Sequence, residues 1–189
     1  FLHKDISSAI TQREIGTDTD SFETGLKAAL REDPDVILIG EMRDTITIDT
    51  GMKAAETGHL VFSTLHTTNA VQTISRIIAV FPPHEQPMVR VRLAESLIGV
   101  ISQRFLPKKE GKGRIVAAEV MMVTGTIRDA MLDQDRQSEI YDLIAEGKEQ
   151  YGTQTFDQHL MDLVHNDQVT FETAMAAASN PADFELKMS

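Results

Sequence analysis

The stretch that decides the fold is residues 33–44, which run Asp33-Pro34-Asp35-Val36-Ile37-Leu38-Ile39-Gly40-Glu41-Met42-Arg43-Asp44. Its middle, residues 36–39, is aliphatic without polar interruption, which predicts a strand buried on both faces, as in a parallel sheet. In open α/β sheets, ligands bind just beyond the carboxyl ends of the strands. A carboxylate at that place can hold a magnesium-bound water or orient an attacking water. Glu41 is therefore the first candidate catalytic residue, in the layout of a Walker B strand.

A second apolar stretch, residues 60–65, predicts another buried strand with a histidine at each end. Because an extended chain separates His59 from His66 by the length of the strand, we expect only His66 to emerge beside Glu41. An imidazole there can contact a terminal phosphate. Both histidines could instead be structural, each bonded to a backbone carbonyl. Glu41 could likewise form a surface ion pair with Arg43, which is otherwise a candidate phosphate contact.

The remaining pattern predicts an α/β fold followed by a helical tail. Helix and strand signals alternate over residues 21–103, which favours a mostly parallel sheet with helical cover. The apolar spacing of Val89, Leu93, Leu97 and Ile101 predicts one long helix after Pro83. We expect a hairpin at about 105–123 and only helices beyond it. The predicted domains are residues 1–123, a core with its hairpin, and residues 124–189, a small all-helical subdomain. The expected helices of the tail lie near 125–133, 137–146, 155–165, 170–178 and 181–187.

Composition excludes several classes of function. The 189 residues are 41% hydrophobic and carry a formal net charge of −11. Acid excess disfavours a nucleic-acid surface and direct binding to acidic lipid. The absence of Cys excludes disulfides and Cys-based zinc sites and suits the cytosol. No apolar run approaches the roughly 20 residues that span a bilayer. The chain begins with Phe1 rather than Met, so we expect it to be a fragment of a longer protein.

The sequence contains no Gly-x-x-x-x-Gly-Lys-Ser/Thr loop, which cradles phosphates in many nucleotide hydrolases. We therefore expect the chain alone to bind ATP weakly or not at all. Two specific motifs nevertheless point to such an enzyme. Residues 30–44 resemble the Walker B motif of the type II/IV secretion ATPase superfamily, and residues 57–67 resemble its His box. Residues 12–22 and 101–107 resemble the stretches before Walker B and at the end of the core. Within the superfamily, the chain is most similar to type IV pilus twitching and retraction ATPases, the PilT and PilU type.

This resemblance implies a partial RecA-like P-loop NTPase core from a hexameric motor that uses ATP and magnesium. It implies pilus retraction at the cytoplasmic face of the bacterial inner membrane, by a protein peripheral to that membrane. The implied partners are further copies of the chain, a platform protein at the pilus base and a paralogous retraction ATPase. By position, Glu41 would act on the magnesium and water network. His59 and His66 would be the His-box histidines, with His66 the nearer to nucleotide.

The sequence departs from the family in two ways. Its Walker A loop and Asp box would lie upstream of Phe1, so the fragment alone is expected to be inactive. Retraction ATPases carry an Ala-Ile-Arg-Asn-Leu-Ile-Arg-Glu motif, of which residues 126–133 keep only the Ile127-Arg128 pair intact. This departure favours an accessory, PilU-like motor.

Two alternative functions stay open at this point. The chain could be a non-catalytic oligomerisation or interaction module of a pilus or secretion base. It could also come from a pilus-extension or type II secretion ATPase. Those ATPases usually insert a four-cysteine zinc subdomain after the core, whereas this chain has no Cys.

Overall fold

The computed structural model describes residues 3–189, and the chain falls into two compact units, Phe1–Leu65 (unit 1) and His66–Ser189 (unit 2). The sequence predicts a division near residue 123 instead, which lies inside unit 2, directly after a hairpin. The division into a core and a helical subdomain stays a prediction.

Unit 1 is a βαβ arrangement preceded by a helix. Its elements are α1 (Phe22–Ala29), β1 (Val36–Ile39), α2 (Thr45–Glu56) and β2 (Leu60–Ser63). Strands β1 and β2 pair in parallel, from Val36 opposite Leu60 to Ile39 opposite Ser63. The predicted parallel pairing is thus confirmed. β2 ends two residues before Leu65, where the sequence had predicted its continuation.

The β1–β2 sheet is buried on one face only. Ile37 and Ile39 point inward and form a cluster with Leu26 of α1 and Ala54 of α2. On the opposite face, Val36 is 53% exposed and Leu38 63% exposed. The prediction of a strand buried on both faces is therefore wrong for this chain. The reason is that successive strand residues alternate between faces, and α1 and α2 supply cover for one of them.

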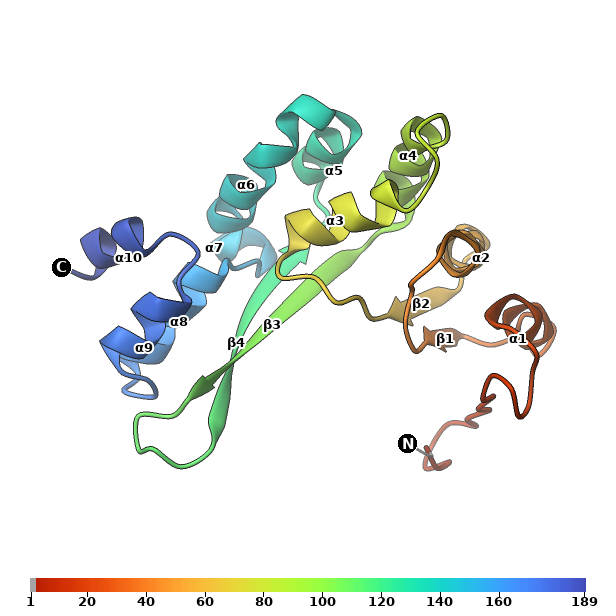
Figure 1. Cartoon of the computed structure of the whole chain (residues 1–189), viewed down its shortest axis with the longest axis horizontal. Helices are drawn as coiled ribbons and strands as arrows, with labels where there is room; N and C mark the ends of the chain where they lie inside the picture. The colour runs from red at the N-terminus through yellow and green to blue at the C-terminus, as the bar shows by residue number, and fades with distance from the viewer. Residues whose placement is uncertain (1–2) are drawn as a thin grey trace. The chain divides into compact units, whose positions relative to one another are not determined.

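Unit 2 is built on an antiparallel hairpin of two nine-residue strands, β3 (Gly99–Pro107) and β4 (Arg114–Met122). Figure 1 shows its helices gathered along one side of this hairpin. The inward residues of the hairpin include Leu106 and Ala117, which share a core with Phe156 and Leu160. The helical elements of unit 2 are α3 (Ala70–Ala79), α4 (Gln86–Ser96), α5 (Gly125–Leu132), the 3-10 helix η1 (Gln134–Glu139), α6 (Ile140–Glu146), α7 (Lys148–Tyr151), α8 (Phe156–His165), α9 (Phe171–Ala177) and α10 (Pro181–Met188).

The long helix predicted to reach Ile101 is wrong, because α4 ends at Ser96 and Ile101 lies in β3. Gly99, the first residue of β3, lies close to the backbone of the partner strand. A Cβ at this position would lie 2.7 Å from the carbonyl oxygen of Met121. The close approach of β3 to β4 therefore depends on glycine, a contact across the hairpin that helical spacing does not reveal.

The predicted hairpin and helical tail are present. The hairpin is longer than expected, since β3 begins six residues before the predicted start at 105. At the start of α8, Thr155 and Gln158 form the predicted capping box, in which each side chain bonds the other residue's backbone amide. Local capping signals thus place this helix correctly.

Candidate functional site

The carboxyl ends of β1 and β2 are joined by two hydrogen bonds beyond the strands themselves. The Thr64 hydroxyl donates to the Gly40 carbonyl at 2.6 Å, and the Met42 amide donates to the Thr64 carbonyl at 3.2 Å. Glu41 lies between these two connected positions. The backbone on either side of Glu41 is therefore fixed by Thr64, the residue that follows β2.

The Glu41 side chain is partly buried, at 25% exposed, and forms an ion pair with the Arg43 guanidinium, whose side chain is 75% exposed. Hydrogen bonding to the Glu41 carboxylate raises the pKa of Arg43. An ion pair this exposed contributes little net stability, because water screens it and two long side chains must be ordered. Breaking this pair would cost little free energy, so the ion pair does not conflict with the predicted phosphate contact of Arg43, which stays a prediction.

Asp44, the second acid after β1, has a structural role. One of its carboxylate oxygens accepts the Thr47 amide at 2.8 Å, and the other accepts the Thr47 hydroxyl at 3.2 Å. Asp44 is the N-cap of α2 and satisfies one of the amides that a helix start leaves without an intrahelical partner. Glu41 is the other acid at this strand end, and its catalytic role stays a prediction.

His59 lies at the opposite edge of the sheet from Glu41. It precedes β2 at the end where Leu60 pairs with Val36, whereas Glu41 follows the other end of β1. Four residues at about 3.3 Å each separate the two edges. The His59 Nδ1 atom lies 3.1 Å from the Ala54 carbonyl oxygen and 3.1 Å from the Thr57 hydroxyl. Within unit 1, His59 and Glu41 therefore lie at opposite edges of the sheet. The predicted contact of His59 with nucleotide stays a prediction.

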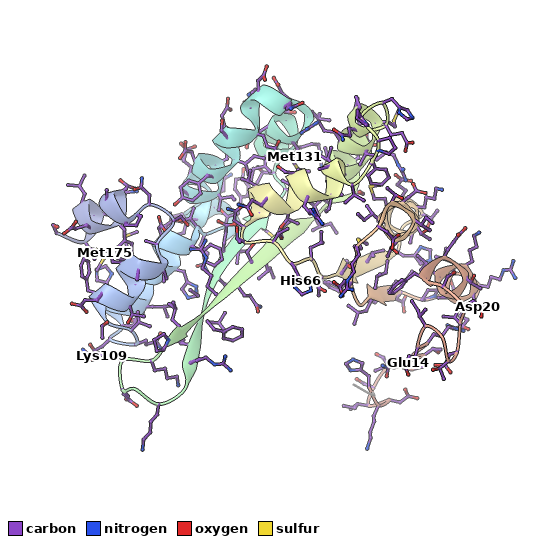
Figure 2. All side chains as sticks on the ribbon, in the orientation of Figure 1. Glu14, Asp20, His66, Lys109, Met131 and Met175 are labelled. Carbon is purple, nitrogen blue, oxygen red and sulfur yellow. The ribbon has the colours of Figure 1, made fainter. Side chains whose placement is uncertain are left out.

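His66 is exposed and belongs to unit 2, in the segment that leads into α3 (Figure 2). This segment is well ordered by local bonds. The Thr67 and Thr73 hydroxyls lie 2.7 Å apart, and the Asn69 side chain accepts the Gln72 amide at 2.8 Å as the N-cap of α3. Because Glu41 and His66 fall in different compact units, their predicted proximity stays a prediction.

Sequence reasoning placed the Thr64 hydroxyl near His66, whereas the structure shows that it connects the two strand ends of unit 1. In unit 2, sequence reasoning missed Glu119 altogether. Glu119 is 2% exposed in β4 and accepts the backbone amide of Ala70, the first residue of α3, at 2.7 Å. The available signal was its position: an acid midway between Ala117 and Met121, at the inward spacing of a strand that is otherwise apolar after Arg114.

Within residues 3–189 there is no group of three or more His, Asp or Glu side chains arranged to hold a metal. In the same range, no helix combines the length and the apolar composition required to cross a bilayer. Magnesium bound through water at Glu41 stays a prediction.

Comparison with known proteins shows that this chain is similar to secretion and pilus ATPases. The family model for the type II/IV secretion system protein matches residues 7–176. The type IV pilus retraction ATPase PilT of Pseudomonas aeruginosa is 46% identical over 184 residues, covering 97% of this chain and 53% of that protein. The type IV pilus ATPase PilU of the same organism is 39% identical over 188 residues, covering 98% and 48%.

Solved structures agree. The crystal structure of the pilus retraction motor PilT with bound ADP superposes with a TM-score of 0.86 at 44% identity, covering 98% of this chain and 51% of that one. The ATPase DotB of Legionella pneumophila gives a TM-score of 0.78 at 26% identity, covering 93% and 47%. The predicted α/β class is thus confirmed. The chain spans about half the length of the curated relatives it matches. It belongs to the family of type II/IV secretion system proteins.

Proposed function

We propose that the full-length protein containing this chain is an ATPase motor that powers retraction of type IV pili. The observation that carries the proposal is the strand-end geometry of unit 1, where Glu41 follows β1 between two hydrogen bonds to Thr64. The similarity to PilT, at 46% identity over 97% of the chain, supplies the class of reaction. The alternatives are not favoured, since the identity to PilT, 46%, exceeds the 32% to a type II secretion system protein E that covers 92% of the chain.

The residues present fit one part of a nucleotide site. Glu41 offers a carboxylate at a strand end, and Arg43 offers a cation that a weak surface pair holds nearby. Magnesium bound to ATP would neutralise negative charge on the phosphates during transfer. In this chain, Glu41 would orient the attacking water and accept its proton, while Arg43 and His66 would contact phosphate. The phosphate-cradling loop would come from outside this chain, so the chain alone would not hydrolyse ATP.

The assembly is proposed on the same basis. A motor of this family would form a homo-hexamer at the cytoplasmic face of the inner membrane. It would act on a platform protein at the pilus base, beside a paralogous retraction ATPase. The altered residues 126–133 favour an accessory role, whereas the identities of 46% to PilT and 39% to PilU do not single out that role.

The test is Glu41→Gln in the full-length protein. Loss of a general base costs about 10²–10⁴-fold in rate, so we expect kcat for ATP hydrolysis to fall by at least about a hundredfold. The dissociation constant for ATP, measured separately, should change little because the amide keeps the shape of the side chain. Retained ATPase activity would remove Glu41 from the mechanism.

Asp44→Asn is the matched control, since it neutralises the neighbouring acid. Asn caps helices about as well as Asp, so α2 and the ATPase rate should be preserved. Equal loss of rate in both variants would show that charge in this loop matters rather than the Glu41 carboxylate itself.

A further inference from the structure

The starting observation is a carboxylate buried under α3. Glu119 is 2% exposed, and its neighbours on the inward side of β4, Ala117 and Met121, are both 0% exposed. Burial raises the pKa of Glu119, against the opposing effects of the Ala70 amide and the Arg104 charge. A buried acid costs free energy unless hydrogen bonds compensate it, and an apolar residue at such a site is often at least as stable. Packing alone therefore does not explain an acid here.

The hydrogen bond of Glu119 is directed at one particular place. Its Oε1 atom accepts the Ala70 amide, across 49 residues of sequence. Ala70 is the first residue of α3 and is 0% exposed, so its amide has no intrahelical acceptor and little access to water. Asn69 already caps the helix through the Gln72 amide. Glu119 thus adds a second, long-range connection to the same helix start.

This helix start is continuous with the segment that carries His66. Residues 66–69 lie between the chain's second strand and Ala70, and the Thr67 hydroxyl is bonded to Thr73 within the first turn of α3. Fixing Ala70 to β4 therefore limits both the position and the direction of the backbone that leaves His66.

The neighbouring charged groups have other partners. The Arg104 guanidinium donates to the Ala177 carbonyl and stacks on Phe156. Asp157 accepts the amides of Ser179 and Asn180. Glu119 is the member of this buried group whose hydrogen bond reaches α3.

We propose that Glu119 is a positioning residue: by accepting the Ala70 amide it fixes the start of α3, and with it the His66 side chain, for the reaction. The inference rests on the proposed function of His66 as a phosphate contact. Glu119 itself touches no reacting atom. Its effect is transmitted through Ala70 and the three residues before it.

The experiment measures kcat and KM for ATP and the melting temperature in the full-length protein. Glu119→Ala removes the acceptor, and small misplacement of a reacting group costs up to about a hundredfold, so we expect kcat to fall about ten- to hundredfold. Glu119→Gln keeps an acceptor oxygen and should restore kcat to within about threefold, because a neutral carbonyl can still accept the Ala70 amide. If the alanine variant does not fold, Glu119→Met fills the volume without an acceptor and serves the same test.

A double-mutant cycle with His66→Ala separates the possible outcomes. If Glu119 acts through His66, Glu119→Ala should lower kcat much less in the His66→Ala background than in the wild type. Equal losses in both backgrounds, or an unchanged kcat in Glu119→Ala, would overturn the inference. Wild-type kcat in His66→Ala would instead overturn the proposed role of His66 on which the inference rests.

Asp157→Ala is the matched structural control. Asp157 is also a buried acid, 6% exposed, and accepts two backbone amides, but these belong to Ser179 and Asn180 rather than to α3. We expect it to lower the melting temperature while kcat of the folded protein changes less than about twofold. A loss of kcat equal to that of Glu119→Ala would assign both effects to general destabilisation and contradict the positioning role.

Discussion

The two sheets of this chain use strand pairing in opposite ways. The parallel β1–β2 pair of unit 1 is short, has one covered face and presents Glu41 at its end. The antiparallel β3–β4 hairpin of unit 2 is long, is packed under helices and keeps its acid, Glu119, inside. The two glutamates therefore lie in contrasting environments, and the roles proposed for them, chemistry for Glu41 and support for Glu119, follow that contrast. Their environments differ because Glu41 follows the end of β1, whereas Glu119 lies within β4 with its side chain facing the core.

The largest expected effect compares two phenylalanines of unit 2 that each pair with an arginine. Phe156 is 0% exposed, and its ring centroid lies 3.8 Å from the guanidinium carbon of Arg104. Phe105 is 61% exposed, and its ring centroid lies 5.2 Å from the guanidinium carbon of Arg114. Phe156→Ala should lower the free energy of unfolding by about 3–5 kcal/mol through lost burial and a residual cavity. Phe105→Ala should cost no more than about 1 kcal/mol, the scale of an exposed cation–π contact.

Denaturant unfolding followed by circular dichroism measures both variants. Comparable losses in the two would show that the outer face of the hairpin is covered in the protein. The contrast between a packed and an open side of the hairpin would then be wrong.

A smaller effect distinguishes the two faces of β1. Ile39 is 6% exposed and Leu38 63% exposed. Ile39→Ala should therefore cost about 2–4 kcal/mol, in the range for buried aliphatic truncation. Leu38→Ala should stay within about 0.5 kcal/mol, as expected for a surface substitution. Equal losses of unfolding free energy in the two variants, measured by the same assay, would show that both faces of β1 are covered in the protein, as the sequence predicted.

The smallest effect concerns pH and Glu119. Burial raises its pKa above the ordinary value of 4.5 in the folded state. The folded state therefore binds this proton more tightly than the unfolded state, and stability should fall as pH rises from about 4.5 through the folded pKa. Melting temperatures across this range should show a shallower dependence in Glu119→Gln. An identical pH profile in that variant would show that Glu119 does not titrate with folding.

The sequence predicted those features that depend on neighbours along the chain. The strand at 36–39 followed by Glu41, the capping box at Thr155 and the hairpin near 105–123 all follow from local pattern. The failures involve residues distant in sequence. Apolar spacing alone could not show that Gly99 must approach Met121, nor that one face of β1 lacks cover within unit 1. The hydrogen bond from Ala70 to Glu119 spans 49 residues and has no local signal.

The cap at Asp44 has a consequence for anion recognition beside Glu41. Helix amino termini attract phosphate because their free amides and dipole favour negative charge. At α2 that role is already filled by the protein's own carboxylate, which accepts the Thr47 amide. An incoming phosphate would meet repulsion there rather than an attractive dipole, so attraction on this side of the strand would have to come from exposed cations such as Arg43. If nucleotide binds beside Glu41 as proposed, its affinity should depend on ionic strength more strongly than binding to a preformed backbone cradle would.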